Sequence, residues 1–425
     1  MKYQHRVLGM LALLSVITYL DRVCIAVAGP AMQDSLGISP SGWGWVTGIF
    51  FFSYGAFEIP TGTLGDRIGP RRVLTRIVLW WSAFTSLTGV VTNYFWLLVV
   101  RFCFGAGEAG AYPNVSTVIA RWTPATSRAR AWGFVWMMSQ IGAAISPLLV
   151  VPIQMRYGWQ ASFFVFGIVG VVWAAGWFRW FRDSPAEKAG VTAAELQEIG
   201  PSASIGHGGM PWRRVLRRAG LWQLIGIAAC YVYALAFYQS WLQTYLVKGR
   251  GYTEAALVLS SLPYIVGAVA NGLGGVASDW LVRRFGLCMG RRLLGVGGLS
   301  WAAAFMAAAA VTKSGAWALV FLSLAYAGIL VQQPNICAVA LDTGRDHAGA
   351  VFACANTAAQ VASTLSSVLF GYLVEYFGNY NAPLVPMVLT LCVGAWIWLK
   401  VDATRQLFEE EAPLHTPALA PVASP

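Results

Sequence analysis

The chain contains twelve separate apolar runs, and each is long enough to cross a lipid bilayer. A helix needs about 20 mainly apolar residues to span the hydrocarbon core. The runs lie at 7–30, 43–65, 73–92, 94–118, 131–153, 159–181, 220–246, 254–280, 293–312, 315–341, 349–374 and 382–400. None alternates with the period of two that a transmembrane strand requires. The sequence therefore predicts an all-α polytopic membrane protein with twelve transmembrane helices in two six-helix bundles.

The distribution of basic residues predicts the orientation. With both termini placed in the cytoplasm, cytoplasmic segments hold 23 of the 29 Lys and Arg residues, and outer segments hold four. Cytoplasmic loops of membrane proteins carry such an excess. The net charge of +11 then follows from topology and requires no nucleic-acid partner. The seven cysteines are scattered without metal or disulfide spacing, so neither a metal nor a cofactor is predicted.

The longest polar stretch divides the chain into two halves. We predict an N-terminal bundle at 1–181, a cytoplasmic linker at 182–219, a C-terminal bundle at 220–402 and a disordered cytoplasmic tail at 403–425. GTLGDRIGPRR (62–72) after the second run is echoed by GGVASDWLVRR (274–284) after the eighth. Paired halves of this kind are typical of transporters that rock two bundles around a central site.

Five ionisable residues lie inside the predicted spans, all of them in the first half. They are Asp21, Arg22, Glu58, Arg101 and Glu108. A charge at the bilayer centre costs at least about 2.5–3.5 kcal/mol, so such residues usually face a protein interior and mark a transport or proton path. The matching spans of the second half offer amides, hydroxyls and aromatic rings instead.

Three motifs carry a resemblance to a known family. The 62–72 segment resembles the G-x-x-x-D-R-x-G-x-R-R loop of the major facilitator superfamily and matches it completely. YLDRVCIAVAGP (19–30) and RFCFGAGEAGAYPN (101–114) resemble the anion:cation symporter family within it, with weaker support from FYQSW in the seventh span. That family includes bacterial sugar-acid carriers and vertebrate sialic-acid, phosphate and glutamate carriers. The resemblance implies alternating access and a monomeric protein.

The charged residues can be given roles on this basis. We expect Arg22 to attract a substrate carboxylate while Asp21 and Glu108 take up and release protons. All four histidines fall in predicted cytoplasmic segments, so a proton relay in the membrane must use carboxylates. Arg101 is two turns from Glu108 and is predicted to tune it. A self-neutralising Asp21–Arg22 pair and a structural Arg101–Glu108 network are the alternatives.

Gating residues are expected at the inner end of the second span. Asp66, Arg67 and Arg71 of the matched loop are predicted to stabilise one conformation of an inner gate. Glu58 departs from the family, whose members usually carry an amide there. It is either a third protonatable site or part of the inner gate facing the eleventh span, unless it only donates a hydrogen bond while protonated.

The remaining pocket residues are mostly uncharged. Substrate contacts are predicted for Tyr54, Tyr112, Gln239, Trp241, Asn356 and Thr357. Helix–helix hydrogen bonding is the alternative for each of them. Resemblance points most strongly to Gln239 and Asn356. Glutamate-type members carry Arg where Gln239 stands, so a second cationic anchor is missing at this position, which favours a monocarboxylate with hydroxyls over a dicarboxylate.

Together these features predict proton-coupled symport of a small organic anion into a bacterial cell across the inner membrane. A sugar acid, either a hexonate or a hexuronate, is the expected substrate. Cotransported protons would offset the cost of anion entry, about 2.3 kcal/mol per charge per 100 mV. An aromatic-acid or dicarboxylate carrier, an anion exchanger and a Na⁺-coupled system are alternatives, and a transport-dead sensor is a different class. Enzymatic activity is not expected, because the spans hold no nucleophile–base pair or metal ligands.

Overall fold

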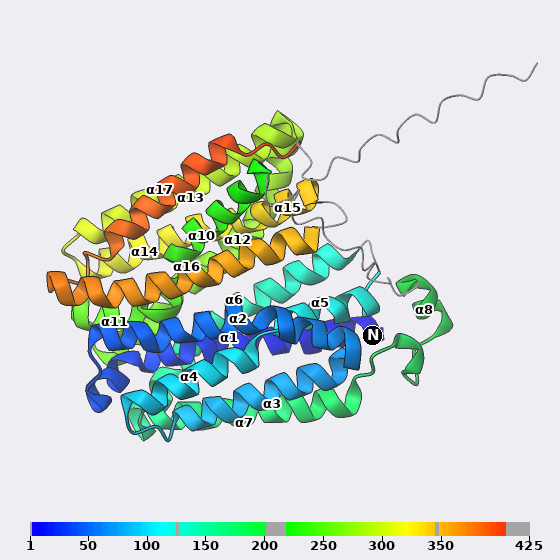
Figure 1. Ribbon diagram of the computed structural model, residues 1–425, viewed down its shortest axis with the longest axis horizontal. Coiled ribbons are helices and arrows are strands. Elements are labelled where there is room, and N and C mark those ends of the chain that lie inside the picture. The colour runs from blue at the N-terminus through cyan, green and yellow to red at the C-terminus, as the bar shows by residue number, and fades with distance from the viewer. Residues whose placement is uncertain (1, 125–126, 201–217, 345–347, 405–425) are drawn as a thin grey trace, which may run out of the picture.

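The computed structural model describes residues 2–124, 127–200, 218–344 and 348–404 (Figure 1). Every regular element in these ranges is helical. The first half consists of α1 (Tyr3–Leu36), α2 (Pro40–Ile68), α3 (Pro70–Thr88), α4 (Tyr94–Glu108), α5 (Ala111–Trp122), α6 (Arg128–Tyr157) and α7 (Trp159–Trp180). The second half consists of α10 (Ala219–Ser240), α12 (Ser261–Phe285), α13 (Leu287–Val311), α14 (Gly315–Val331), α15 (Gln333–Gly344), α16 (Ala348–Phe377) and α17 (Leu384–Lys400).

Short helices join these elements. They are η2 (Pro185–Glu187), α8 (Ala193–Ile199), α11 (Leu242–Thr244), the π-helix η3 (Tyr245–Gly249) and the 3₁₀ helix η4 (Glu254–Ser260). Eight helical segments in the described ranges are both long enough and apolar enough to cross a membrane, and α17 is a shorter apolar helix. Each of the twelve predicted spans corresponds to one long helix or to a run of two or three consecutive ones. The chain is therefore a multi-pass membrane protein.

The helices form two bundles whose long axes run side by side (Figure 1). One bundle holds α1–α7 and the other α10–α17, and they meet where α2 packs on α16, α6 on α12 and α1 on α11. We call the end that holds Tyr3 and Trp180 the basal end, and the end that holds Leu36 and Trp159 the distal end. This is the twelve-helix, two-bundle arrangement that the sequence predicts.

The fourth and tenth spans, which the sequence predicts as continuous, are each divided into two α-helices. The fourth divides into α4 and α5 at Gly110, whose φ of 85° favours glycine. The tenth divides into α14 and α15 at Gln332. Pro113 and Pro334 then lie in first turns, where a missing N–H breaks no helical hydrogen bond. A hydropathy window of about 20 residues averages over these breaks, so hydropathy alone does not locate them.

The bundles are in close contact at the distal end. A Cβ atom added to Gly44 of α2 would lie 2.7 Å from the Ser367 carbonyl oxygen of α16, so the helix backbones nearly touch. The Ser41 backbone N–H donates to Glu375 at 2.9 Å, and Lys248 pairs with Asp34 at 2.7 Å. The structure is therefore closed at the distal end.

The start of the predicted linker packs on the basal end of the first bundle. The Gln4 backbone N–H donates to the Glu195 carboxylate of α8 at 2.8 Å, and the Lys2 ammonium pairs with Glu198 at 2.5 Å. The Lys2 hydrogen bond lowers the pKa of the Glu198 carboxyl. Residues 182–200 are thus part of the first bundle, whereas 201–217 and most of the predicted tail lie outside the described residues.

Candidate functional site

A buried ion pair joins the first span to the fourth. The Arg22 Nε lies 2.6 Å from Glu108 Oε1, and the two side chains are only 10% and 1% exposed. Asp21 is buried beside this pair, and neither of its carboxylate oxygens has a partner among the described residues. The structure thus pairs Glu108 with Arg22, whereas the sequence analysis placed it with Arg101 on one helix face.

Aromatic rings surround the Arg22 guanidinium. Its Cζ lies 4.7 Å from the ring centre of Tyr54, 5.2 Å from that of Phe50 and 5.5 Å from that of Tyr19. Tyr112 stacks on Trp136 at 4.9 Å, and its buried hydroxyl has no partner among the described residues. Such a cage holds a cation in place while leaving other guanidinium nitrogens available for an anion. Arg22 Nη2 has no described hydrogen-bond partner.

Arg101 is a second buried cation close to the first. It is 4% exposed, and its guanidinium lies over Phe50 at 4.9 Å and over Phe104 at 4.8 Å. Its Nε has no hydrogen-bond partner, and none of the described ion pairs includes it.

Both arginines line a cavity between the bundles. The cavity is lined by Arg22, Ile25, Thr47, Phe50, Phe51, Arg101, Gln239 and Ser240. The last two residues come from α10 of the second bundle, so the cavity is shared by both halves. Of the predicted substrate residues, Arg22 and Gln239 line it. Its eight lining residues include two cations and no carboxylate.

Glu58 contacts the second bundle directly. Asn356 Nδ2 of α16 donates to both carboxylate oxygens of Glu58, at 2.7 and 2.6 Å. The contact lies on the basal side of the cavity, where the next residue, Thr357, is exposed and hydrogen-bonds the Ala353 carbonyl. Of the roles open for Glu58, this geometry favours the one between the bundles. The same contact occupies the amide of Asn356, which the sequence predicts to bind substrate.

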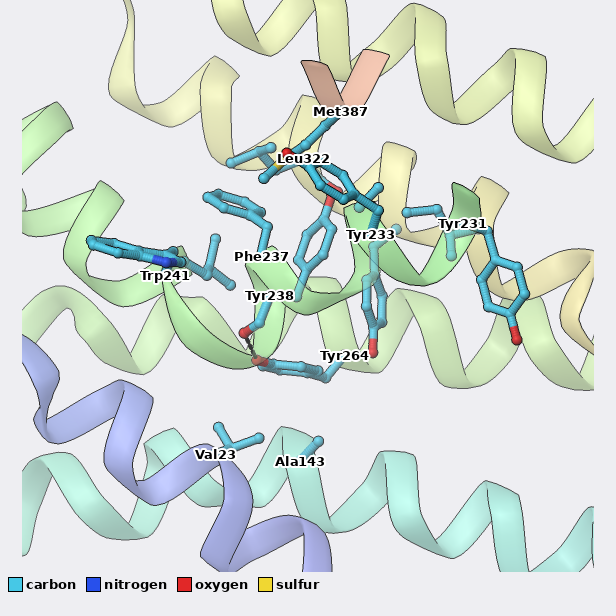
Figure 2. Packing of buried hydrophobic residues seen from close by; sticks show 14 of the residues in the cluster. Val23, Ala143, Tyr231, Tyr233, Phe237, Tyr238, Trp241, Tyr264, Leu322 and Met387 are labelled. Atoms are coloured by element: carbon cyan, nitrogen blue, oxygen red, sulfur yellow. Dashed lines mark hydrogen bonds between the residues drawn. The ribbon is translucent and has the colours of Figure 1, made fainter. Parts of the chain in front are cut away.

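Trp241 lies in the core of the second bundle (Figure 2). Its indole N–H donates to the Ser367 carbonyl at 3.0 Å, and its ring stacks on Phe370 at 4.4 Å. The residue is fully buried, and it is absent from the cavity lining. The structure therefore gives Trp241 helix–helix contacts, which was the alternative for this residue.

The matched loop motif anchors α3 to α7. The Arg71 backbone N–H donates to the Asp183 carboxylate at 2.8 Å, and the Arg71 side chain donates to the Phe178 carbonyl at 2.9 and 2.6 Å. Arg67 is exposed, and the Asp66 side chain lies outside the described part of the structure. The predicted gating role of these residues stays a prediction.

Four further residues of the site region were not predicted from the sequence: Tyr19, Thr47, Gln140 and Tyr326. Tyr19 precedes Arg22 by three positions, so helical spacing could have placed both on one face. The Tyr326 hydroxyl of α14 donates to Gln140 of α6 at 3.1 Å and joins the bundles at a buried position. No signal in the sequence pairs these two residues, because their positions are 186 apart.

Two helical bundles around a shared cavity are the arrangement typical of secondary transporters. The chain belongs to the Major Facilitator Superfamily, whose family model matches residues 11–366. It is accordingly a transporter and not an enzyme.

Curated relatives carry the names of anion transporters. A "Probable sulfoacetate transporter SauU" of Cupriavidus necator is 35% identical over 93% of both chains. A "Hexuronate transporter" of Bacillus subtilis is 27% identical over 87% of this chain and 88% of its own. A "Probable galactarate/D-glucarate transporter GudP" of the same species is 28% identical, over 88% and 87%.

A solved structure shares the fold. The inward-facing, unoccupied structure of a bacterial homologue of the human lysosomal transporter Spinster superposes with a TM-score of 0.77. It is 19% identical in sequence, and the match covers 95% of this chain and 97% of that one. This likeness supports the two-bundle fold.

Proposed function

We propose that this transporter takes up a small organic anion into a bacterial cell by proton-coupled symport. The observation that carries the proposal is the buried Arg22–Glu108 pair, whose arginine lines a cavity between the bundles and whose neighbour Asp21 has no described partner. An anion entering this cavity competes with Glu108 for Arg22. Glu108, once released, would remain as a buried unpaired charge, which is costly unless it takes up a proton.

Coupling follows from this competition. The anion binds Arg22 while Glu108 and Asp21 become protonated, and the loaded cavity then carries less negative charge than an anion alone would give it. Release of the anion lets Glu108 return to Arg22, and Glu108 and Asp21 then lose their protons. We propose that the protein lies in the inner membrane with the basal end and both termini in the cytoplasm, and that it works as a monomer without a cofactor.

The substrate class has two candidates. A sugar acid is supported by the relatives named for hexuronate and for galactarate/D-glucarate, and by the Gln239 amide at the cavity. A short acid with two negative groups is supported by the relative named for sulfoacetate and by the two arginines that line the cavity.

The test is uptake into proteoliposomes that contain the purified protein and carry an imposed pH gradient, acidic outside. Wild-type protein should accumulate a radiolabelled organic anion, and dissipating the gradient should abolish accumulation. Asp21→Asn and Glu108→Gln should lose pH-driven accumulation while still exchanging anion across the membrane, because neither variant can release a proton at that site.

Glu187→Gln is the control, since Glu187 of η2 is exposed and does not line the cavity. It should accumulate anion at a rate similar to wild type. If Asp21→Asn and Glu108→Gln both retain pH-driven accumulation, the coupling scheme is wrong. Saturable anion exchange that ignores the pH gradient in the wild-type protein would identify an exchanger instead.

A further inference from the structure

The strongest unexplained feature of the cavity is Arg101. A guanidinium that is nine-tenths buried normally has a carboxylate or several carbonyl groups as partners. Arg101 has no described ion pair, and its Nε has no hydrogen-bond partner. It nevertheless lines the cavity beside Arg22. An unsatisfied buried cation that faces a cavity is suited to an anionic ligand group.

We propose that Arg101 is a second anion anchor, and that the substrate is a short dianion whose two acidic groups bind Arg22 and Arg101. This inference rests on the proposed anion transport and narrows its substrate class. Arg101 would take the place of the second cation that is missing at the position of Gln239. The anchor comes from the fourth span of the first bundle and not from the seventh.

The two guanidinium groups are close enough for one ligand to contact both. Their Cζ atoms lie 5.2 and 4.9 Å from the centre of the same Phe50 ring, so they are no more than about 10 Å apart. A bidentate guanidinium–carboxylate pair keeps its two carbons about 4 Å apart. A small ligand with two acidic groups can therefore bind both arginines at once.

The rest of the lining agrees with a short ligand. Phe50, Phe51 and Ile25 are apolar, and the Thr47 hydroxyl already donates to the Trp43 and Gly44 carbonyls. The Ser240 hydroxyl contacts Ser367. Gln239 is thus the one lining side chain with an uncommitted amide among the described hydrogen bonds. A hexonate would bring five hydroxyl groups into a cavity with few available partners.

The first experiment is a length series measured on wild-type protein in detergent. We would determine binding of malonate and its sulfonate analogue, then of succinate, glutarate and adipate, with glycolate and gluconate as single-charge probes. Affinity should be greatest for the two shortest dianions and at least about tenfold weaker for glycolate, because one charge-assisted contact is lost. Equal affinity for glycolate and malonate, or tighter binding of adipate or gluconate, would overturn the proposal.

The second experiment removes the proposed anchor. Arg101→Gln should weaken malonate binding at least about tenfold and leave glycolate binding within twofold, and Arg101→Lys should restore part of the preference. Arg156 is exposed at the distal end, so Arg156→Gln makes the same change of charge at a different place. This variant should bind all probes as the wild-type protein does. A purely structural role of Arg101 predicts equal losses for malonate and glycolate. That result, or an unchanged malonate preference, would contradict the inference.

The two proposals fail in different ways. If proteoliposomes accumulate a monocarboxylate with the pH gradient but ignore short dianions, proton symport stands and the Arg101 anchor is wrong. If short dianions bind through Arg101 but no pH gradient drives their uptake, the anchor stands and proton coupling is wrong.

Discussion

At the residue scale, each buried carboxylate in the first bundle has different surroundings. Glu108 pairs with an arginine, Asp21 has no described partner, and Glu58 accepts two hydrogen bonds from an amide of the opposite bundle. Of these three carboxylates, only Glu58 has a described hydrogen bond to the other bundle. Because the bundles must separate during the cycle, a contact of this kind suits a gate better than a permanent structural element.

We predict that Glu58 and Asn356 are energetically coupled. A hydrogen bond to a charged group contributes about 1.5–3 kcal/mol. The melting temperature of the Glu58→Ala/Asn356→Ala double variant should therefore fall by clearly less than the two single decreases combined. Glu58→Ala with Thr357→Ala is the control and should be additive, because Thr357 bonds only its own helix backbone in the described contacts. Additivity in both cycles would contradict a contact between the bundles.

A transport assay distinguishes the two roles predicted for Glu58, an inner gate and a third protonatable site. Glu58→Gln keeps an acceptor for Asn356 but cannot titrate, so pH-driven accumulation should persist if the residue is a gate. Loss of accumulation with retained exchange would make it a third proton site.

Sequence reasoning was most reliable for which residues matter and less reliable for their partners. The five membrane charges stand out because their insertion is costly. Arg101 and Glu108 are seven residues apart and both are buried, but the pairing of Glu108 with Arg22 depends on how α1 packs against α4. That packing is a property of the tertiary structure, and no local spacing encodes it. The same limit applies to Trp241. Composition alone cannot tell whether this residue packs in the core or lines a pocket.

At the element scale, the distal closure depends on small residues where α2 meets α16. A Cβ atom added at Gly371 would contact the Pro40 carbonyl oxygen, and one at Gly44 would contact that of Ser367. Small residues of this kind let helix backbones approach closely in membranes. The exposed Lys248–Asp34 pair next to this contact is worth at most about 1 kcal/mol, so packing is the stronger term.

We predict that Gly371→Val opens the distal end. Overpacking costs about 1–3 kcal/mol, which should shift the equilibrium away from the distally closed state. The initial uptake rate should fall at least about fivefold, and the melting temperature should drop. Gly272→Val is the matched control, since a Cβ at Gly272 of α12 meets nothing within 4 Å. Equal effects of the two substitutions would show that loss of glycine flexibility, and not the contact, is responsible.

Helix positions were predictable because the length and hydropathy of a span follow directly from bilayer thickness. The breaks at Gly110 and Gln332 were not predicted, and the one at Gly110 depends on a neighbouring helix. Gly110 lies against Thr61 of α2, and a side chain there would clash with it. The partner that requires the glycine is 49 positions away in the sequence, so no local window contains both residues.

At the scale of the whole molecule, the net charge of the cavity determines how transport responds to the membrane potential. The cavity cluster comprises two arginines, Arg22 and Arg101, and two acids, Asp21 and Glu108. With both acids ionised and no ligand, the four charges cancel. With both acids protonated and a dianion bound, the charges of the two arginines and of the dianion cancel. If Glu58 keeps one protonation state, neither the empty nor the loaded form moves net charge through the membrane.

We therefore predict electroneutral uptake of a short dianion. An inside-negative potential of about 100 mV, set with potassium and valinomycin, should change the initial rate less than twofold at a fixed pH gradient. Movement of one net charge would instead change the driving force by about 2.3 kcal/mol. Strong acceleration by the potential would imply an additional proton, with Glu58 as the next carboxylate to examine by substitution.

The docking of α8 on the first bundle has a practical consequence. Because Gln4, Lys2 and α8 are joined by hydrogen bonds at the basal end, this small projection must travel with the first bundle as one rigid body. It breaks the approximate symmetry of two otherwise similar halves surrounded by detergent. An antibody fragment raised against α8 would serve as a fixed landmark for image alignment, and a fluorophore placed there would give a stationary reference against which movement of the second bundle can be measured.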